Sequence, residues 1–255
     1  VYNDLDSLRI LFEAHPGEFA AVILEPMNIQ EPAPGFLKGV VDLAHSHGSV
    51  AIFDETITGF RFARGGAQEL FGVTPDLACF GKGLANGYPL SAVVGRADIM
   101  KEFENVFFSF TMGGEALSLA AARAVLTKMR EQPVIEQLAA KGTHLIEATR
   151  KLIVKHGCGE FLSVSGHPSW SFLIIKDTPS ATNWEIKTLW LQEIFARGIL
   201  SVGTHNLTYA HTDADIDALL VAYDEVFPIL AASVTDNRIN QYLRCKPLEP
   251  LFKVR

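Results

Sequence analysis

One short stretch decides the fold class, Val50-Ala51-Ile52-Phe53-Asp54, in which four apolar residues end in a carboxylate. Two other stretches repeat this plan: residues 20–24 are apolar and end at Glu25, and residues 77–80 lead to Lys82. Short, uninterrupted apolar runs separated by helices are typical of a mostly parallel sheet whose strands are buried on both faces. The sequence therefore predicts an α/β domain.

Further elements follow from periodicity and from helix-stopping residues. A break at Gly157-Cys158-Gly159 separates the α/β part from a region with fewer, shorter strands, which predicts a smaller α+β domain. We place the large domain at 1–130 and the small domain with its tail at 131–255. The remaining expected strands are 90–95, 106–110, 161–164, 171–175, 199–202 and 207–210, and the expected helices are 35–47, 115–130, 134–156, 181–197 and 213–230.

Composition excludes several classes of function. The net charge of −7 over 255 residues, without a lysine and arginine cluster, argues against a nucleic-acid partner. No apolar run is long enough to cross a membrane, and no signal peptide opens the chain. Three scattered cysteines and histidines without ligand spacing predict no disulfide framework, no metal site and a cytoplasmic location. The chain begins at Val1 within a helical pattern, so we expect a fragment, a processed chain or part of a larger protein.

Lys82 is the first candidate for chemistry. It stands between Gly81 and Gly83, and glycines let a backbone approach a flat ligand closely. A lysine directly after a buried strand is expected to be partly desolvated, which lowers its pKa. A neutral amine can attack an aldehyde and form a Schiff base. The alternative is a surface lysine in a glycine-rich turn.

Asp54 is the second candidate. It follows an apolar strand directly, and a carboxylate at the edge of a dry sheet needs a cationic partner. A protonated pyridine nitrogen would be such a partner, since a carboxylate beside it lets the ring act as an electron sink. The alternatives are a helix cap, or an ion pair with Arg61 or Arg64.

One segment resembles the D-E-V-x-T-G-F-R signature of class-III aminotransferases, which use pyridoxal 5′-phosphate (PLP): it reads Asp54-Glu55-Thr56-Ile57-Thr58-Gly59-Phe60-Arg61. Residues 65–77 closely resemble the matching segment of glutamate-1-semialdehyde aminomutases. Lys82 falls where this family keeps its Schiff-base lysine, 28 residues (82 − 54) after Asp54. The similarity runs from about Phe19 to Phe227.

The resemblance implies a PLP-transferase fold of type I and a role for each matching residue. Lys82 would carry PLP as an internal aldimine, and Asp54 would face the pyridine nitrogen. Glu25 would lie near the active site, while Thr56 and Ile57 would pack against the ring face. The segment Phe110-Thr111-Met112-Gly113-Gly114 resembles the family's S-T-x-G-G, whose threonine touches the phosphate bound to the neighbouring subunit. A homodimer with shared active sites is therefore expected. A local helix cap is the alternative for Thr111.

The chain departs from the family pattern at several places. Thr56 replaces a valine, and Glu115-Ala116 replaces Asn-Pro. Residues 203–210 lack the arginine that binds a substrate carboxylate in many members, so recognition of a dicarboxylate is in doubt. The family's amino-terminal third, with its phosphate loop and ring-stacking aromatic residue, has no counterpart in this sequence.

The expected activity is transfer of an amino group between a small amino compound and an oxo acid or aldehyde, with Lys82 as the proton carrier. An intramolecular amino shift, as in the aminomutases, and a racemisation need the same groups. A non-catalytic domain that keeps the fold and a dimer surface is the alternative from another class. Site chemistry transfers with a motif, whereas the choice of substrate does not.

Overall fold

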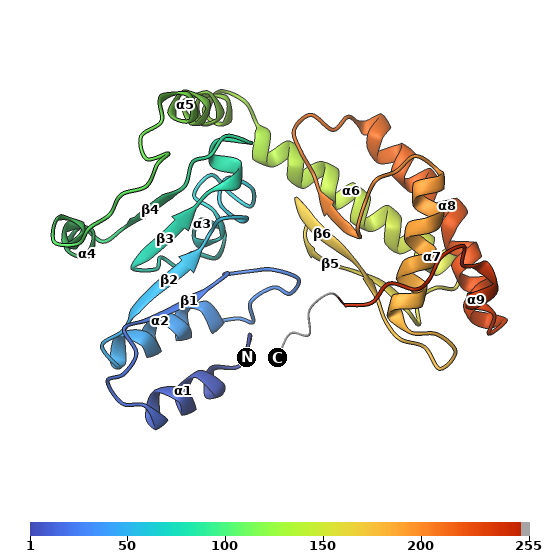
Figure 1. The fold of residues 1–255 in the computed structure, drawn as a ribbon, viewed down its shortest axis with the longest axis horizontal. Coiled ribbons are helices and arrows are strands. Elements are labelled where there is room, and N and C mark those ends of the chain that lie inside the picture. Colours follow the sequence, from blue (N-terminus) through green and yellow to red (C-terminus); the bar gives the residue numbers. More distant parts are fainter. Residues whose placement is uncertain (251–255) are drawn as a thin grey trace. The chain divides into compact units, whose positions relative to one another are not determined.

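The computed structural model describes residues 1–250 and divides into two compact units, Val1–Glu136 and Gln137–Arg255 (Figure 1). Residues 251–255, the end of the predicted small domain and its tail, lie outside the described residues. Each unit has its own sheet and its own apolar core.

The first unit contains a four-stranded sheet in the order β1-β2-β3-β4. Strands β1 (Ala21–Leu24), β2 (Val50–Asp54) and β3 (Leu77–Phe80) are parallel, which confirms the three strands and the mostly parallel sheet predicted from the apolar runs. Strand β4 (Ala92–Gly95) is antiparallel to β3. The carboxyl ends of the three parallel strands therefore meet at one edge of the sheet.

Helices cover one face of this sheet. Helices α1 (Leu5–Ala14) and α2 (Phe36–Ser46) lie on the same side of it (Figure 1), and their apolar side chains pack with Ala51 and Phe53 of β2. On the opposite face Ile23 is 62% exposed. The other helical elements are α3 (Ala67–Phe71), η1 (Lys82–Leu84), α4 (Ala97–Met100), η2 (Lys101–Glu104) and α5 (Ala116–Glu131).

The predicted strand at 106–110 is wrong, because this segment is irregular. Phe107, Phe108 and Phe110 are all exposed, Phe107 at 96%. Three aromatic residues in four positions give no alternation between the two faces of a strand, so no register would bury them all.

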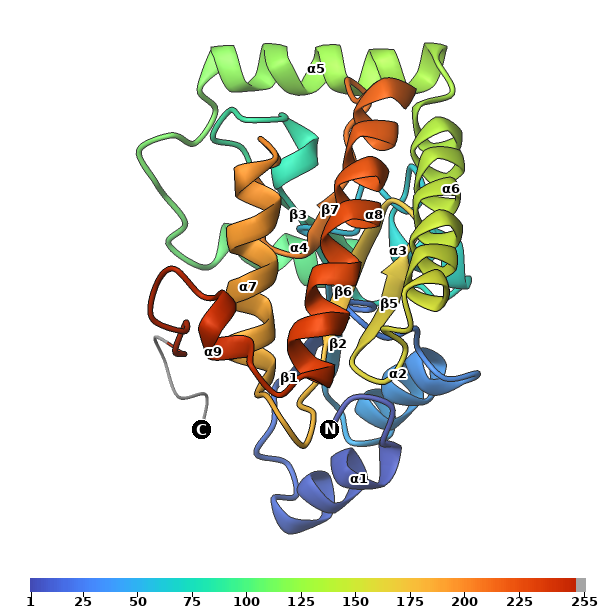
Figure 2. The same ribbon diagram turned by 90° about the vertical axis from the view of Figure 1, so that its right-hand side faces the viewer.

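The second unit is an antiparallel sheet packed against helices. Strands β5 (Leu162–His167), β6 (Trp170–Ile175) and β7 (Thr204–Asn206) lie in that order. Helices α7 (Asn183–Ala196) and α8 (Asp213–Thr235) run side by side (Figure 2). With α6 (Val134–Lys155), whose first residues belong to the first unit, they cover the apolar face of β5 and β6; the short α9 (Ile239–Tyr242) follows.

The strands expected at 199–202 and 207–210 are wrong, since β7 lies between them. Gly198 and Gly203, with φ of 77° and 93°, bound the first segment, and such left-handed positions interrupt a strand. The helix predicted at 213–230 is confirmed and begins with a capping box between Thr212 and Asp215.

Helix α8 is long and apolar enough to cross a membrane by length and composition alone. Its first turn carries Asp213 and Asp215, and its residues Tyr223, Phe227 and Leu230 are fully buried in the core of the second unit. These contacts are those of a core helix.

His205 of β7 forms the middle of a buried polar chain. Its Nδ1 lies 2.8 Å from Ser171 Oγ and its Nε2 lies 2.8 Å from the Tyr223 hydroxyl, and the residue is only 4% exposed. Burial lowers the pKa of His205 from 6.5 to about 4 and raises the pKa of Tyr223. His205 is therefore neutral in the folded protein at neutral pH.

Acidification is expected to destabilise the protein through His205. Between pH 6.5 and about 4 the unfolded chain binds a proton at this histidine that the folded chain does not bind. The free energy of unfolding then falls as pH falls, by up to about 1.4 kcal/mol per pH unit. Urea unfolding across this range should show a flatter pH dependence for His205→Gln. The same change at the exposed His144 should leave the dependence as in the wild type, and an equal slope for wild type and His205→Gln would contradict the assignment.

Candidate active site

Three chemically active side chains follow the three parallel strands. Glu25 comes directly after β1, Asp54 is the last residue of β2, and Lys82 follows β3 by two residues. Because these strands are parallel and adjacent, the structure places all three at the same edge of the sheet, as the sequence predicts.

Within residues 1–250 the Asp54 carboxylate has no basic partner. Its Oδ1 accepts a hydrogen bond from the Thr56 backbone N–H at 3.0 Å. The interactions described for the Asp54 carboxylate include neither Arg61 nor Arg64. Its neighbour across the sheet is Cys79, whose pKa is raised by burial and, secondarily, by the charge of Asp54. The negative charge of Asp54 is thus available to a cation beside the sheet.

Lys82 has an unusual backbone. Its φ is +39°, in the left-handed region that a residue with a Cβ adopts at an energetic cost. Its side chain is exposed and, within residues 1–250, makes no hydrogen bond or ion pair. The side chain of Lys82 is thus exposed at the strand end, contrary to the expected partial desolvation. Non-glycine residues in such conformations are concentrated at functional sites.

The glycine before Lys82 provides space. Gly81 has φ of −166°, which any residue can adopt, so its backbone does not require glycine. A Cβ at this position would lie 3.2 Å from Cγ2 of Thr56 and 3.9 Å from Cβ of Ser91. The missing side chain keeps the backbone beside Thr56 open to a flat group.

A closed turn presents Thr56 and Ile57. The backbone N–H of Gly59 donates to the carbonyl of Glu55 at 2.8 Å, and the Thr58 hydroxyl donates to the Glu55 carboxylate. Thr56 and Ile57 lie between these two anchors and are half-buried, whereas Glu55 and Thr58 are fully buried. The turn therefore holds both predicted ring contacts next to Asp54.

Glu25, at the end of the outer strand β1, is held by neighbouring residues. Its carboxylate accepts from Asn28 Nδ2 at 2.9 Å. The hydroxyl of Tyr2 donates to the carbonyl of Pro26 at 2.6 Å and fixes the chain just after Glu25. Burial raises the pKa of Tyr2 to about 12, so this donor keeps its proton.

Thr111 is not brought to the strand ends by any hydrogen bond of the described chain. It is exposed in a turn before α5. It is not the helix cap: Glu115 caps α5, its carboxylate accepting from the N–H groups of Leu117 and Ser118, both at 2.7 Å. Glu115, which replaces the asparagine of the family pattern, thus serves as the N-terminal cap of α5.

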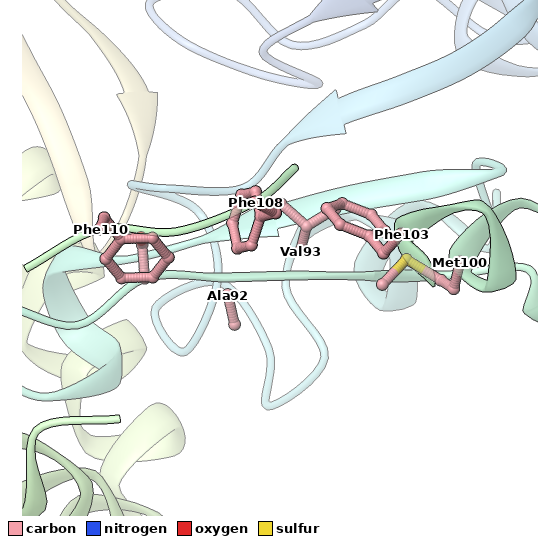
Figure 3. A pocket seen from close by; sticks show the side chains of 7 residues that line it. Ala92, Val93, Met100, Phe103, Phe108 and Phe110 are labelled. Carbon is pink, nitrogen blue, oxygen red and sulfur yellow. The ribbon is translucent and has the colours of Figure 1, made fainter. Parts of the chain in front are cut away.

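An apolar pocket of about 380 Å³ lies beside the segment that leads to Thr111 (Figure 3). Phe108 contacts Phe103 and Phe110 edge to face, with ring centroids 5.1 and 5.2 Å apart. The pocket contains no charged side chain; its lining residues are Ser91, Ala92, Val93, Met100, Phe103, Phe108 and Phe110. Among residues 1–250 no group of three histidine, cysteine or acidic side chains is arranged to hold a metal ion.

Two features of the site were missed from sequence. In the sequence Glu55 is only one letter of a family signature, whereas in the structure it is the buried anchor of the turn. Cys79 is one of the three scattered cysteines to which the sequence assigns no role, although it lies directly opposite Asp54. Strand alternation from Phe80 back to Cys79 would have indicated which face Cys79 shares with Asp54.

The comparisons with known proteins point the same way as this geometry. The model of the family described as Aminotransferase class-III matches residues 2–168. A glutamate-1-semialdehyde 2,1-aminomutase of Syntrophobacter fumaroxidans is 37% identical in an alignment of length 249 that covers 89% of this chain and 56% of that protein. A 3-aminobutyryl-CoA aminotransferase of Cloacimonas acidaminovorans is 32% identical over 84% of this chain and 54% of its own length.

A solved structure is similar over nearly the whole chain. The PLP internal aldimine form of the FumI protein of Sphingopyxis sp. MTA144 superposes with a TM-score of 0.82 and 29% identity, over 92% of this chain and 57% of that one. The chain thus spans little more than half the length of the proteins it resembles.

Proposed function

The chain belongs to the class-III aminotransferase family, and on that premise we propose that it is the catalytic part of a PLP-dependent aminotransferase. Its fold is the type I fold of PLP transaminases, as the resemblance implied. The observation that carries the proposal is the placement of Asp54 and Lys82 at the ends of adjacent parallel strands, neither of them engaged by an ion pair among the described residues.

The residues present fit PLP. Asp54 offers a negative charge without a basic partner to a protonated ring nitrogen. Lys82 offers an amine at the neighbouring strand end, and Gly81 leaves open the space beside Thr56 that a flat ring requires. A complete binding site for the phosphate is not formed by the described residues near Thr111, which is exposed in a turn.

Each of these side chains has a definite task in the proposed mechanism. Bound PLP supplies a conjugated ring that accepts the electron pair left when a substrate C–H bond loses its proton. Lys82 Nζ would hold the cofactor, and the same amine, when free, would act as the base that takes the proton from the substrate carbon that carries the amino group. Asp54 would stabilise a protonated ring nitrogen, while Thr56 and Ile57 would pack against one face of the ring. Glu25 lies at the same edge of the sheet and would contribute to the cofactor site.

The substrates we propose are a small amino donor and an oxo acid or aldehyde acceptor. Residues 203–210 lack an arginine, which disfavours a second carboxylate on the substrate at that position. Residues 1–130 are proposed as part of the large PLP-binding domain and residues 131–255 as the small domain. Free cysteines at 79, 158 and 245 support a reducing, cytoplasmic location.

Absorption and half-reactions of the full-length protein test the activity. With PLP bound, a band near the visible edge should appear and be erased by borohydride. An amino donor alone should release about one oxo product per site, and continued turnover should need an added oxo acceptor. Continued turnover of one substrate without an acceptor would favour the amino shift instead, and the absence of any band would favour a non-catalytic domain.

A homodimer with shared active sites is part of the proposal, and Thr111 carries its test. The exposed Phe107, Phe108 and Phe110 beside Thr111 support an interface, since aromatic residues are enriched there. Thr111→Ala should weaken PLP affinity roughly ten- to hundredfold, the scale of a hydrogen bond to a charged group. The same change at the exposed Thr74 should leave PLP affinity unchanged.

Subunit exchange then tests the sharing. Lys82→Ala and Thr111→Ala proteins are mixed at a PLP concentration that leaves the Thr111→Ala protein mostly unloaded. Shared sites predict recovered activity, because one site in each mixed dimer combines an intact Lys82 with an intact Thr111 from the other subunit. No recovery despite proven exchange, or a fully loaded monomer in sedimentation, would contradict the proposal.

A further inference from the structure

Glu55 is a buried acid that the proposed mechanism does not use. Its side chain is 0% exposed, and within the described chain it has no lysine, arginine or histidine in ion-pair distance. Burial of an unpaired carboxylate is costly, so its hydrogen bonds must offset a large desolvation penalty.

The carboxylate of Glu55 joins two segments that are distant in sequence. One oxygen accepts from the backbone N–H of Ala67 at 2.8 Å and also from the Thr58 hydroxyl. The other accepts from the N–H of Gln68 at 2.7 Å. The start of α3 and the turn after β2 are thus held together by one group.

Gly66 leaves room for this arrangement. Its φ is +85°, and a Cβ there would collide with the Glu55 carboxylate. The backbone of Glu55 is held as well, because its N–H donates to the carbonyl of Cys79 on β3 at 2.9 Å. Glu55 is therefore fixed from strand β3, from α3 and from its own turn.

The hydrogen bonds continue from Glu55 to Asp54. Glu55 holds Thr58 and Gly59, and these two residues close the turn that contains Thr56. The Thr56 N–H in turn donates to Oδ1 of Asp54. A shift of the turn would move this donor and let the Asp54 carboxylate rotate.

We propose that Glu55 is a positioning residue: its buried carboxylate holds the 55–59 turn, and the turn sets the orientation of Asp54 toward the cofactor ring. This inference rests on the proposed function. A misplacement of about 1 Å at a reacting group can lower a rate by roughly a hundredfold, so the effect of losing this anchor should be measurable. A role confined to capping α3 is the competing explanation.

Four variants of the full-length protein separate these explanations. Glu55→Gln keeps the shape of the side chain but turns an NH₂ group toward one of three donors. Glu69→Gln is the matched control, because Glu69 lies in α3, whose first N–H groups Glu55 binds, and its exposed carboxylate also accepts a backbone N–H, that of Gly65 at 2.6 Å. Thr58→Val removes one donor and leaves Glu55 intact, and Asp54→Asn is the reference for loss of the charge.

The decisive measurement is the pH midpoint of the visible band of bound PLP, which reports the charge beside the ring. Glu55→Gln should shift this midpoint in the same direction as Asp54→Asn, and PLP affinity should fall roughly tenfold. Thr58→Val should shift it less, and Glu69→Gln should not shift it. Thr58→Val carries the test if Glu55→Gln does not fold.

A Glu55→Gln protein with a lower unfolding midpoint but a wild-type band would overturn the inference and leave Glu55 as a helix cap. If Glu55→Gln does not fold, an unshifted band in Thr58→Val would also overturn the inference. An unshifted band in Asp54→Asn would instead refute the proposed role of Asp54, and with it the inference. The failure of the inference alone is therefore distinguishable from that of the function.

Discussion

Lys82→Ala is expected to abolish turnover and to remove the visible absorption band of the PLP-loaded protein. Alanine has no amine to attach the cofactor or to carry a proton, so both readouts should be lost together. Mass spectrometry after borohydride reduction of the wild type should place the phosphopyridoxyl group on Lys82. Lys101→Ala, a change at an exposed lysine 19 residues (101 − 82) away, should keep the band and the activity. An adduct on Lys101 or any other lysine would refute the assignment.

Asp54→Asn should retain the fold and some PLP binding but lower kcat by several orders of magnitude. An amide cannot stabilise the positive charge on the ring nitrogen, and a carboxylate in such a site contributes several kcal/mol, each 1.36 kcal/mol being about tenfold in rate. Steady-state kinetics and the PLP dissociation constant are the measurements. Asp42→Asn, the same change in an exposed residue that pairs with Lys38, should have wild-type kinetics. Near-normal turnover of Asp54→Asn would mean that another group faces the ring nitrogen.

The strands that bear the site could be predicted because their apolar runs are short and uninterrupted. Glu25, Asp54 and Lys82 follow from those runs, since the carboxyl ends of adjacent parallel strands share one edge. The location of these three side chains at one edge of the sheet could therefore be predicted from the sequence. The assignment of a cofactor to it needed the resemblance as well.

Elements without a clear alternation were not predictable in the same way. Residues 106–110 are as apolar as a strand but lack a register that buries their three phenylalanines. In the second unit the strand β7 contains His205. A polar histidine suggests a loop in the sequence, and its hydrogen bonds to Ser171 and Tyr223 appear only in the structure. Tertiary hydrogen bonds decide such short strands, and local sequence does not contain them.

The side-chain environment of the site was the least predictable part. Lys82 was expected to be desolvated and is exposed, because its burial depends on parts of the protein beyond its own strand. Glu55 is buried because its partners are the N–H groups of residues 67 and 68, and no periodicity reveals that contact. Contacts between residues this far apart in the sequence become visible only in the folded structure.

At Lys82 the requirements of stability and of catalysis oppose each other. The left-handed backbone of this residue lowers the stability of the fold, whereas the proposed activity needs its amine. Glycine adopts φ of +39° without the steric cost that a lysine bears, so Lys82→Gly should be more stable than the wild-type apoprotein by about 1 kcal/mol. Laboratory evolution that rewards only thermal survival would therefore favour replacement of this lysine and lose the proposed activity. A selection that also demands turnover would have to find its stabilising changes elsewhere in the chain.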